Sequence, residues 1–137
     1  MATAREVIEQ HITAFNTRDA EQEPWSPNAQ LVAPGAAVEG RDAVLAFLAV
    51  FHEAFPDGRL QIDRLLSSGD GDAAVEGRFV GTHTGVLRSP AGGAPATGKA
   101  VQFRWAAVYV VRGAELASEH LYFDQLDLLG QLGLLPE

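Results

Sequence analysis

The chain lacks cysteine altogether, and this absence removes several kinds of chemistry at once. Disulfide bonds, thiolate nucleophiles and cysteine-based metal sites are all excluded. Positive charge is also scarce: 10 Lys and Arg residues stand against 18 Asp and Glu residues, which gives a net charge of −8. Such a balance disfavours attraction to nucleic-acid phosphates and anionic lipid, so we expect neither nucleic acid nor a membrane as a partner.

Long apolar runs and common ligand motifs are missing as well. No stretch approaches the roughly 20 apolar residues that cross a bilayer, and residues 1–6 do not combine a charged region with a following apolar one. No HExxH-type spacing occurs, and Gly92-Gly93 precedes neither a Lys-Ser/Thr pair nor a helix signal. From these absences we predict a cytoplasmic protein that holds no metal and no cofactor.

What the chain does contain is typical of a compact domain. Hydrophobic residues make up 47% of the 137 residues, and charged residues make up 20%. A chain of this length buries roughly two thirds of its unfolded surface around one core. We therefore expect one domain over residues 1–137.

Two segments carry the spacing of amphipathic helices. Thr3 and Glu6 form a capping-box pattern, which predicts a helix over residues 3–17. A second apolar face predicts a helix over residues 41–55. The two faces comprise Ile8, His11, Ile12 and Phe15 in the first helix, and Val44, Leu48, Phe51 and Phe55 in the second.

Two other segments have irregular composition. Two prolines in residues 23–28 predict a loop, followed by a short edge strand and turn over residues 31–35. Residues 89–98 are so rich in Gly, Pro and Ala that we expect a flexible connection at the rim of a sheet, well placed to serve as a lid.

The rest of the chain shows the two-residue alternation of β-strands. Turns rich in Gly, Asp or Pro separate the segments, and Gly113 suits a hairpin turn. Helices followed by a long antiparallel meander predict an α+β fold with the helices on one face of the sheet. The predicted strands are residues 60–66, 73–82, 100–112 and 115–123.

Several short motifs follow one another along the whole chain: Ala14-Phe15-Asn16, Gly40-Arg41-Asp42-Ala43, Phe55-Pro56-Asp57, Gly81-Thr82-His83-Thr84-Gly85, Thr97-Gly98-Lys99 and Tyr122-Phe123-Asp124. In this order and spacing they resemble the SnoaL-like polyketide cyclases of the NTF2-like superfamily, which also holds limonene-epoxide hydrolases and ketosteroid isomerases. The resemblance implies a cone of curved antiparallel sheet wrapped around N-terminal helices, with a deep apolar pocket inside. This architecture hosts enzymes, transport factors and binding modules, so fold alone does not name a reaction.

The resemblance also implies where acid–base groups belong, and most of those positions are apolar here. The cyclase aspartate falls on Leu121, a neighbouring His or Asp falls on Ala107, and the isomerase base falls on Ala33. The oxyanion-donor position of the isomerases falls on His11. Alanine and leucine cannot exchange protons, so the known mechanisms do not transfer.

Strand alternation suggests replacements for the missing groups. If Leu121 faces inward, Glu119 does too, and burial among aromatic rings would raise its pKa. We predict Glu119 and His11 as catalytic residues; in the alternative, Glu119 forms a salt bridge and the histidines and tryptophans are structural. The predicted ligand-binding residues are Trp25, His52, His83, Trp105, Tyr109, Leu121 and Phe123.

Two functions stay open at this point. The first is a cofactor-independent cyclase or isomerase, or a hydrolase of this type, that performs acid–base chemistry on an apolar carbonyl compound. The second is a non-catalytic module that binds a hydrophobic small molecule or a protein partner, which the apolar residues at the usual catalytic positions favour. In either case we predict a homodimer formed through the outer sheet face, which carries Gln102, Arg104, Val108 and Val110.

Overall fold

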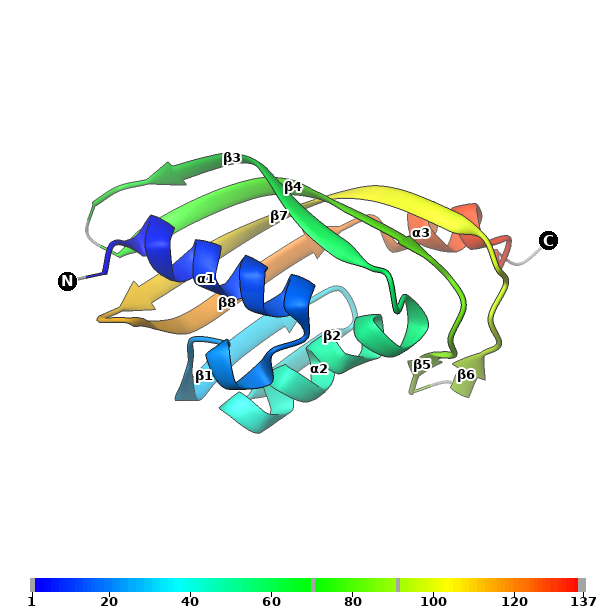
Figure 1. The fold of residues 1–137 in the computed structure, drawn as a ribbon, viewed down its shortest axis with the longest axis horizontal. Helices are drawn as coiled ribbons and strands as arrows, with labels where there is room; N and C mark the ends of the chain where they lie inside the picture. The colour runs from blue at the N-terminus through cyan, green and yellow to red at the C-terminus, as the bar shows by residue number, and fades with distance from the viewer. Residues whose placement is uncertain (1, 70, 91, 136–137) are drawn as a thin grey trace.

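The computed structural model describes residues 2–69, 71–90 and 92–135 and shows helices cradled by a curved sheet (Figure 1). The two long helices are α1 (Ala4–Thr17) and α2 (Arg41–Ala54). The sheet strands are β1 (Trp25–Ala33), β2 (Ala36–Glu39), β3 (Arg59–Ser67), β4 (Asp72–Thr82), β7 (Ala100–Arg112) and β8 (Glu115–Phe123), and they run in the order β2-β1-β8-β7-β4-β3. This architecture confirms the predicted α+β fold class.

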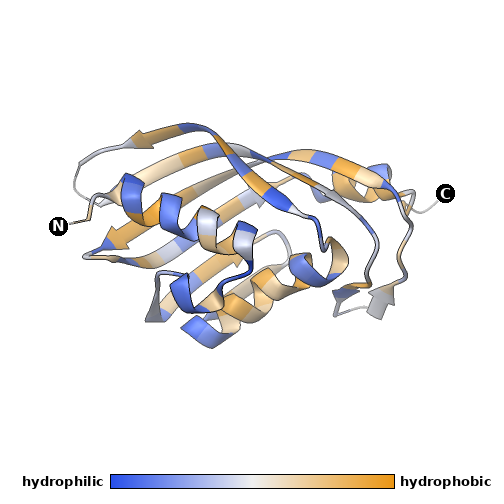
Figure 2. Ribbon diagram, viewed as in Figure 1, coloured by the Kyte–Doolittle hydropathy of each residue, from blue (hydrophilic) through white to orange (hydrophobic). Residues whose placement is uncertain are grey.

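Local sequence signals account for the helix positions. The Thr3 hydroxyl accepts a hydrogen bond from the Glu6 backbone N–H at 3.1 Å, and the Glu6 carboxylate accepts one from the Thr3 N–H at 3.1 Å. This capping box satisfies two free donors at the start of α1. Figure 2 shows hydrophobic residues recurring along both helices and alternating with hydrophilic ones along the strands. Both long helices therefore begin and end close to their predicted bounds.

Three expectations about the first strand are wrong: residues 23–28 are not a loop throughout, the strand is not at the edge of the sheet, and the sheet is not wholly antiparallel. β1 begins at Trp25 and pairs with β8 in parallel and with β2 in antiparallel fashion, so the sheet is mixed and β2, not β1, is its edge. Pro27 is tolerated because the β1–β8 register shifts between Trp25 and Gln30, and pairing with β2 covers only Gln30 onward. Proline cannot donate a ladder hydrogen bond, and it lies where neither partner strand is in regular register.

The segment predicted as a flexible connection contains paired strands instead. β5 (Leu87–Ser89) and β6 (Gly92–Ala94) form a two-stranded antiparallel sheet. Gly92 has a φ of 124°, a value that favours glycine, and this helps the chain reverse at the hairpin. Residue 91 lies outside the described residues. The glycines that argued against a strand therefore shape its turn, and the role of this hairpin as a lid stays a prediction.

A third helix, α3 (Gln125–Leu132), follows β8 and was not predicted. Asp124 caps it by accepting a hydrogen bond from the Asp127 N–H at 3.1 Å, and Gly133 ends it with a φ of 73°. The Gln131 side-chain amide bonds to both backbone groups of Gln102, at 2.8 and 2.9 Å, which fixes α3 against the first residues of β7. No helix in the described part of the chain has the length and apolar character needed to cross a membrane.

Candidate active site

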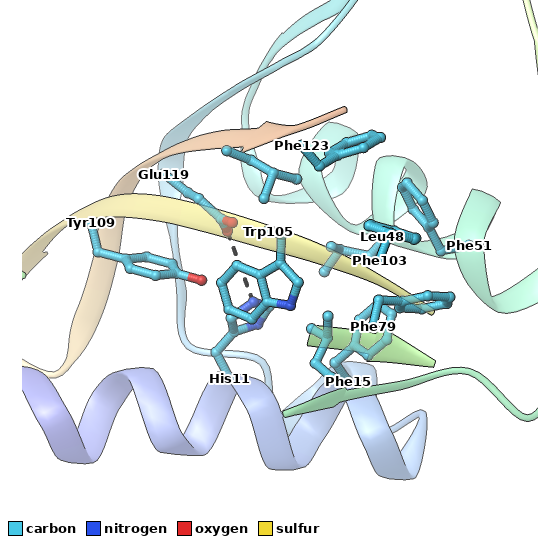
Figure 3. Close-up of a pocket in the computed structure, with 12 residues that line it drawn as sticks. His11, Phe15, Leu48, Phe51, Phe79, Phe103, Trp105, Tyr109, Glu119 and Phe123 are labelled. Atoms are coloured by element: carbon cyan, nitrogen blue, oxygen red, sulfur yellow. Dashed lines mark ion pairs between the residues drawn. The ribbon is translucent and has the colours of Figure 1, made fainter. Parts of the chain in front are cut away.

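A small cavity lies between the helices and the concave face of the sheet (Figure 3). Its volume, measured for the centres of water molecules, is about 40 Å³. Its polar groups gather at one end, which we call the polar end (His11, Trp105, Tyr109 and Glu119), and phenyl rings surround the other end. The full lining consists of His11, Phe15, Leu48, Phe51, Leu60, Phe79, Phe103, Trp105, Tyr109, Glu119, Leu121 and Phe123.

Cross-strand pairing brings the polar end together. Tyr109 of β7 lies directly opposite Glu119 of β8, and both side chains face the interior. Trp105, four residues before Tyr109, lies on the same face and opposite Gly77 of β4. A side chain at Gly77 would approach the indole ring of Trp105 to 2.6 Å, so the absence of a Cβ makes room for that ring.

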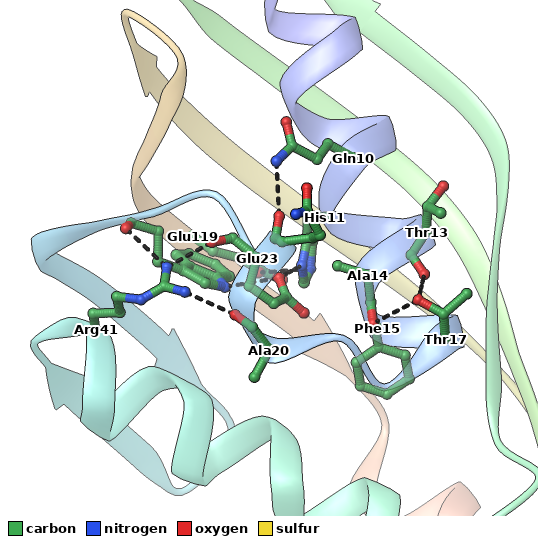
Figure 4. Close-up of polar contacts among 12 residues, drawn as sticks. Gln10, His11, Thr13, Ala14, Phe15, Thr17, Ala20, Glu23, Arg41 and Glu119 are labelled. Atoms are coloured by element: carbon green, nitrogen blue, oxygen red, sulfur yellow. Dashed lines mark hydrogen bonds and ion pairs between the residues drawn. The ribbon is translucent and has the colours of Figure 1, made fainter.

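His11 joins two buried carboxylates. Its Nδ1 atom lies 2.6 Å from Oε1 of Glu23, and its Nε2 atom lies 3.8 Å from Oε1 of Glu119 (Figures 3 and 4). The Trp25 indole N–H donates to the same Glu23 oxygen at 3.0 Å. An ionised carboxylate only accepts, so Nδ1 of His11 carries a proton and donates it to Glu23. Nε2 is therefore the atom that faces Glu119.

Glu23 was not among the predicted site residues. It lies in the segment expected to be a loop, and Arg41 fixes that segment by donating to the carbonyl oxygens of Glu23 at 2.5 Å and Ala20 at 2.7 Å (Figure 4). The side chains of Glu23 and Trp25 are 4% and 2% exposed. Their two-residue spacing in an extended segment is the signal that would have placed both on one inward face.

The environment sets the protonation states of these groups. Burial raises the pKa of Glu119 to about 7, although the positive charge of His11 acts in the other direction. Burial acts to lower the pKa of His11, but the charge of Glu23 and its hydrogen bond, together with the charge of Glu119, raise it overall. Burial and the charge of Glu119 raise the pKa of Tyr109 well above its usual value. Glu119 therefore titrates near neutrality while Tyr109 keeps its O–H.

Several atoms at the polar end have no hydrogen-bond partner among the described residues. They are the Trp105 indole N–H, the Tyr109 hydroxyl and Oε1 of Glu119. Tyr109 favours the charged form of Glu119, yet the two groups do not meet in a hydrogen bond of regular geometry. A buried polar group without a partner costs about 1–3 kcal/mol, and such groups in native proteins usually bind water or a ligand. The polar end therefore contains two hydrogen-bond donors and one carboxyl oxygen that no described group satisfies.

The structure brings six of the nine predicted site residues to this cavity and leaves three outside its lining. Trp25 packs edge-to-face against His11, with ring centroids 5.2 Å apart. His52 has Nε2 3.0 Å from the Phe15 carbonyl oxygen, and its ring is tilted by 44° to the Phe15 ring. His83 lies outside the lining: its Nδ1 accepts from the Thr97 N–H at 3.2 Å, and its ring packs against Phe55. The six that line the cavity are His11, Trp105, Tyr109, Glu119, Leu121 and Phe123, and their roles stay predictions.

The positions where the family resemblance implies acid–base groups are apolar in the structure too. Leu121 and Ala107 lie opposite each other across β7 and β8, and Leu121 lines the cavity. Glu119 lies two residues before Leu121 on the same face, about 7 Å along the strand. The carboxylate of Glu119 thus lies on the strand and face that the resemblance implies, but two residues before the implied position, Leu121. Within the described residues, no group of three or more His, Asp or Glu side chains is arranged to hold a metal ion.

A curved sheet closed over helices around a mostly apolar cavity defines the class of small cone-shaped α+β proteins. A family model described as a SnoaL-like domain matches residues 8–119, so the chain belongs to that family. This match confirms the resemblance found in the sequence. A search of curated protein sequences finds no match to the chain.

Solved structures share the fold over nearly the whole chain. A putative SnoaL-like polyketide cyclase from Jannaschia sp. CCS1 superposes with a TM-score of 0.83 at 20% identity, covering 97% of this chain and 93% of that one. IdmH, a putative polyketide cyclase from Streptomyces antibioticus, gives 0.80 at 23% identity, covering 96% and 99%. A hypothetical protein with a ketosteroid isomerase-like fold from Catenulispora acidiphila DSM 44928, in complex with trimethylamine, gives a TM-score of 0.77 at 18% identity, covering 95% of this chain and 94% of that one. At these identities the likeness shows the fold alone.

Proposed function

We propose that this protein is a cofactor-independent enzyme that moves protons on an apolar carbonyl compound, as a cyclase or isomerase does. The observation that carries the proposal is a buried carboxylate, Glu119, with a pKa of about 7, facing Nε2 of His11. A general acid or base works best when its pKa lies near the working pH. Family membership supports the same class of chemistry.

The geometry supports separate roles for the hydrogen-bond donors and for the base at the polar end. The Tyr109 O–H and the Trp105 N–H are free donors that can bind a carbonyl oxygen and stabilise the negative charge of an enolate. The ionised Glu119 removes a proton from the carbon next to that carbonyl, which breaks the C–H bond and leaves the electron pair in the enolate. Each group acts in a site shielded from water, where its charge is felt most strongly.

Two outcomes can follow from the enolate. In an isomerisation, the proton held by Glu119 returns to a different carbon of the same molecule. In a cyclisation, the enolate carbon attacks a second carbonyl carbon, and the alkoxide that forms takes a proton from Nε2 of His11. Glu23 would then act as a positioning residue, because its hydrogen bond to Nδ1 orients the ring and favours the protonated form of His11.

Deuterium exchange tests this proposal without knowledge of the natural substrate. A compact apolar ketone with acidic α-protons, 2-tetralone, is incubated in D₂O with the protein, and proton loss is followed by NMR. Glu119→Gln keeps the size of the side chain but removes the base, so the exchange rate should fall by about 10²-fold or more. Glu115→Gln, on an exposed residue of the same strand, should leave the rate unchanged. An equal rate in Glu119→Gln would remove Glu119 as the catalytic group.

A non-catalytic binding module is the second candidate, and the apolar pair Leu121 and Ala107 favours it. On that reading the polar end only anchors the carbonyl of a hydrophobic ligand. Quenching of tryptophan fluorescence by 2-tetralone, with no deuterium exchange above the buffer rate, would support binding without catalysis.

We also propose that the protein forms a homodimer through its outer sheet face. A row of side chains crosses five strands there, since the pairing aligns Leu66, Ala74, Val108, His120 and Val32. Leu66, Val108 and Val32 are 54%, 47% and 42% exposed. Apolar side chains gathered on one sheet face usually mark an interface. The centre of this row includes Val108, one of the residues predicted for the interface.

A further inference from the structure

A second, larger hollow adjoins the cavity. We call it the outer cleft; its volume is about 760 Å³, and it lies between α2, α3, the β5–β6 hairpin and the turn between β1 and β2. Figure 1 shows β5, β6 and α3 at the end of the molecule opposite the N-terminus. Apolar side chains dominate its walls, among them Phe47, Val50, Leu87, Leu128, Leu129 and Leu134.

Two phenyl rings belong to both hollows. Phe51 of α2 and Phe123 of β8 line the inner cavity and the outer cleft alike. Their ring centroids lie 6.2 Å apart in an edge-to-face arrangement, and both residues are only partly buried. Figure 3 shows the pair at the end of the cavity away from Tyr109 and Glu119. The two rings are therefore the partition between the inner cavity and the outer cleft.

The small size of the inner cavity limits the ligands that it can hold while this partition stays in place. A volume of about 40 Å³ for water centres holds a few water molecules, since about 10–15 Å³ is needed for each. A ketone with more than a few heavy atoms, 2-tetralone included, fits beside Glu119 only if side chains around the cavity move. The partly buried rings of Phe51 and Phe123 lie between that space and the far larger outer cleft, so a displacement of these rings would give a longer ligand the room it needs.

The chemistry of the outer cleft restricts what it can hold. Arg88 is the one charged side chain in the described lining, and it is already paired with Glu53 at 2.7 Å. The polar side chain of Gln125 donates to the Pro34 carbonyl oxygen at 3.1 Å. With these groups engaged, the cleft offers apolar surface and no free charge for an acidic or basic ligand. A neutral hydrocarbon chain or ring suits it.

We infer that the inner cavity and the outer cleft are two parts of one binding site, joined where Phe51 and Phe123 meet. The ligand class is a ketone whose carbonyl lies at the polar end and whose neutral apolar tail extends into the outer cleft. This inference rests on the proposed function only for the carbonyl end of the ligand. The apolar tail is inferred from the lining of the outer cleft.

Binding of three probes to the intact protein tests the inference. The probes are 2-butanone, 2-decanone and n-nonane, and binding is followed by calorimetry and by quenching of tryptophan fluorescence. Each buried methylene group should tighten binding roughly threefold to fourfold, so 2-decanone should bind at least about 100-fold more tightly than 2-butanone. Leu129→Asn places a polar group in the outer cleft and should weaken 2-decanone about tenfold while leaving 2-butanone unchanged.

Two further variants make the outcome decisive. Leu126→Asn makes the same change on the same helix at an exposed residue outside both hollows, and it should alter neither affinity. Val50→Asn changes the opposite wall of the cleft and should act like Leu129→Asn, which covers the case in which Leu129→Asn does not fold.

The possible results separate the two proposals. Binding of 2-decanone that neither Leu129→Asn nor Val50→Asn weakens would overturn the outer cleft as a subsite. Binding of n-nonane as tight as that of 2-decanone, and weakened by the same variants, would support the tail site and count against recognition of the carbonyl. Failure of 2-decanone to bind at all would overturn the joined site.

Discussion

Oε1 of Glu119 lies 3.8 Å from Nε2 of His11, close enough for each charge to shift the pKa of the other group but too far for a hydrogen bond. A shorter contact would lock a proton between the two side chains. In the proposed reaction, the observed gap would leave Glu119 free to take a proton from a bound ligand and His11 free to give one.

The stability of the protein should fall as the pH rises from about 4.5 to about 7, because of Glu119. The folded protein keeps this proton up to a pKa of about 7, whereas the unfolded chain releases it near the ordinary value of 4.5. The folded state therefore binds more protons in that window, and the free energy of unfolding declines through it by on the order of 3 kcal/mol.

Urea denaturation at about pH 5 and about pH 8 measures this effect. The wild type should lose stability between the two conditions relative to Glu119→Gln, which has no proton to lose. Groups that do not interact with Glu119 cancel in the comparison, whereas His11 loses a charge that helps to raise its pKa, so the difference reports Glu119 together with its effect on His11. Parallel pH profiles for the two proteins would show that Glu119 titrates at its ordinary pKa.

Glu23→Gln should lower the pKa of His11. The charge of Glu23 and its hydrogen bond outweigh the effect of burial on this imidazole, and the amide keeps an acceptor for Trp25 but carries no charge. NMR titration of the His11 ring protons gives the pKa directly. Glu21→Gln, two residues earlier and exposed, is the matched control and should leave it unchanged. An unaltered titration in Glu23→Gln would remove Glu23 as the positioning residue.

Much of the fold could be predicted because its signals are local. The Thr3 capping box and the helical spacing fixed α1, and two-residue alternation fixed β7 and β8 at their observed bounds. The parallel pairing of β1 with β8 could not be predicted, because the two strands are far apart in the sequence and no local pattern records which strands become neighbours. The helix α3 did carry a local signal: Asp124 and Gly133 flank an apolar segment as an N-cap and a C-cap residue do, and together they indicate a short helix.

The candidate site likewise has features that local sequence patterns predict and features that depend on tertiary packing. Alternation along β7 and β8 alone predicts that Tyr109 and Glu119 face inward, and the structure confirms this. His11 followed from the apolar stripe of its helix, but its partner Glu23 is reached only through tertiary packing. His52 also lies on an apolar stripe, yet it bonds to the Phe15 carbonyl, since sequence spacing gives a face and not a hydrogen-bond partner.

Val108→Glu should separate the proposed dimer. Val108 lies at the centre of the apolar row on the outer sheet face, and burying a carboxylate there in both protomers would desolvate two like charges. Light scattering at micromolar concentration should give a dimer mass for the wild type and a monomer mass for the variant. Leu126→Glu, on an exposed residue of α3, should remain dimeric. A monomeric wild type would refute the homodimer.

Leu121→Asp restores a carboxylate where the resemblance to cyclases implies one. Leu121 is partly buried opposite Ala107, which offers no hydrogen bond, so the variant should lose a few kcal/mol of stability unless the carboxylate finds a partner. Leu121→Asn is the matched neutral change. Urea denaturation should show the Asp variant less stable than the Asn variant at about pH 8 and nearly equal at about pH 4, where the carboxyl group is largely protonated.

Activity of the double variant Leu121→Asp/Glu119→Gln tests whether the two positions are interchangeable. Both side chains project from the same face of β8 into one cavity, about 7 Å apart along the strand, so a base at either position can reach a ligand held there. We expect the double variant to recover about tenfold in 2-tetralone exchange over Glu119→Gln alone. A folded double variant without recovery would mean that the cavity has diverged in shape as well as in chemistry, because the ligand would then be held for Glu119 and not for the position that the cyclases use.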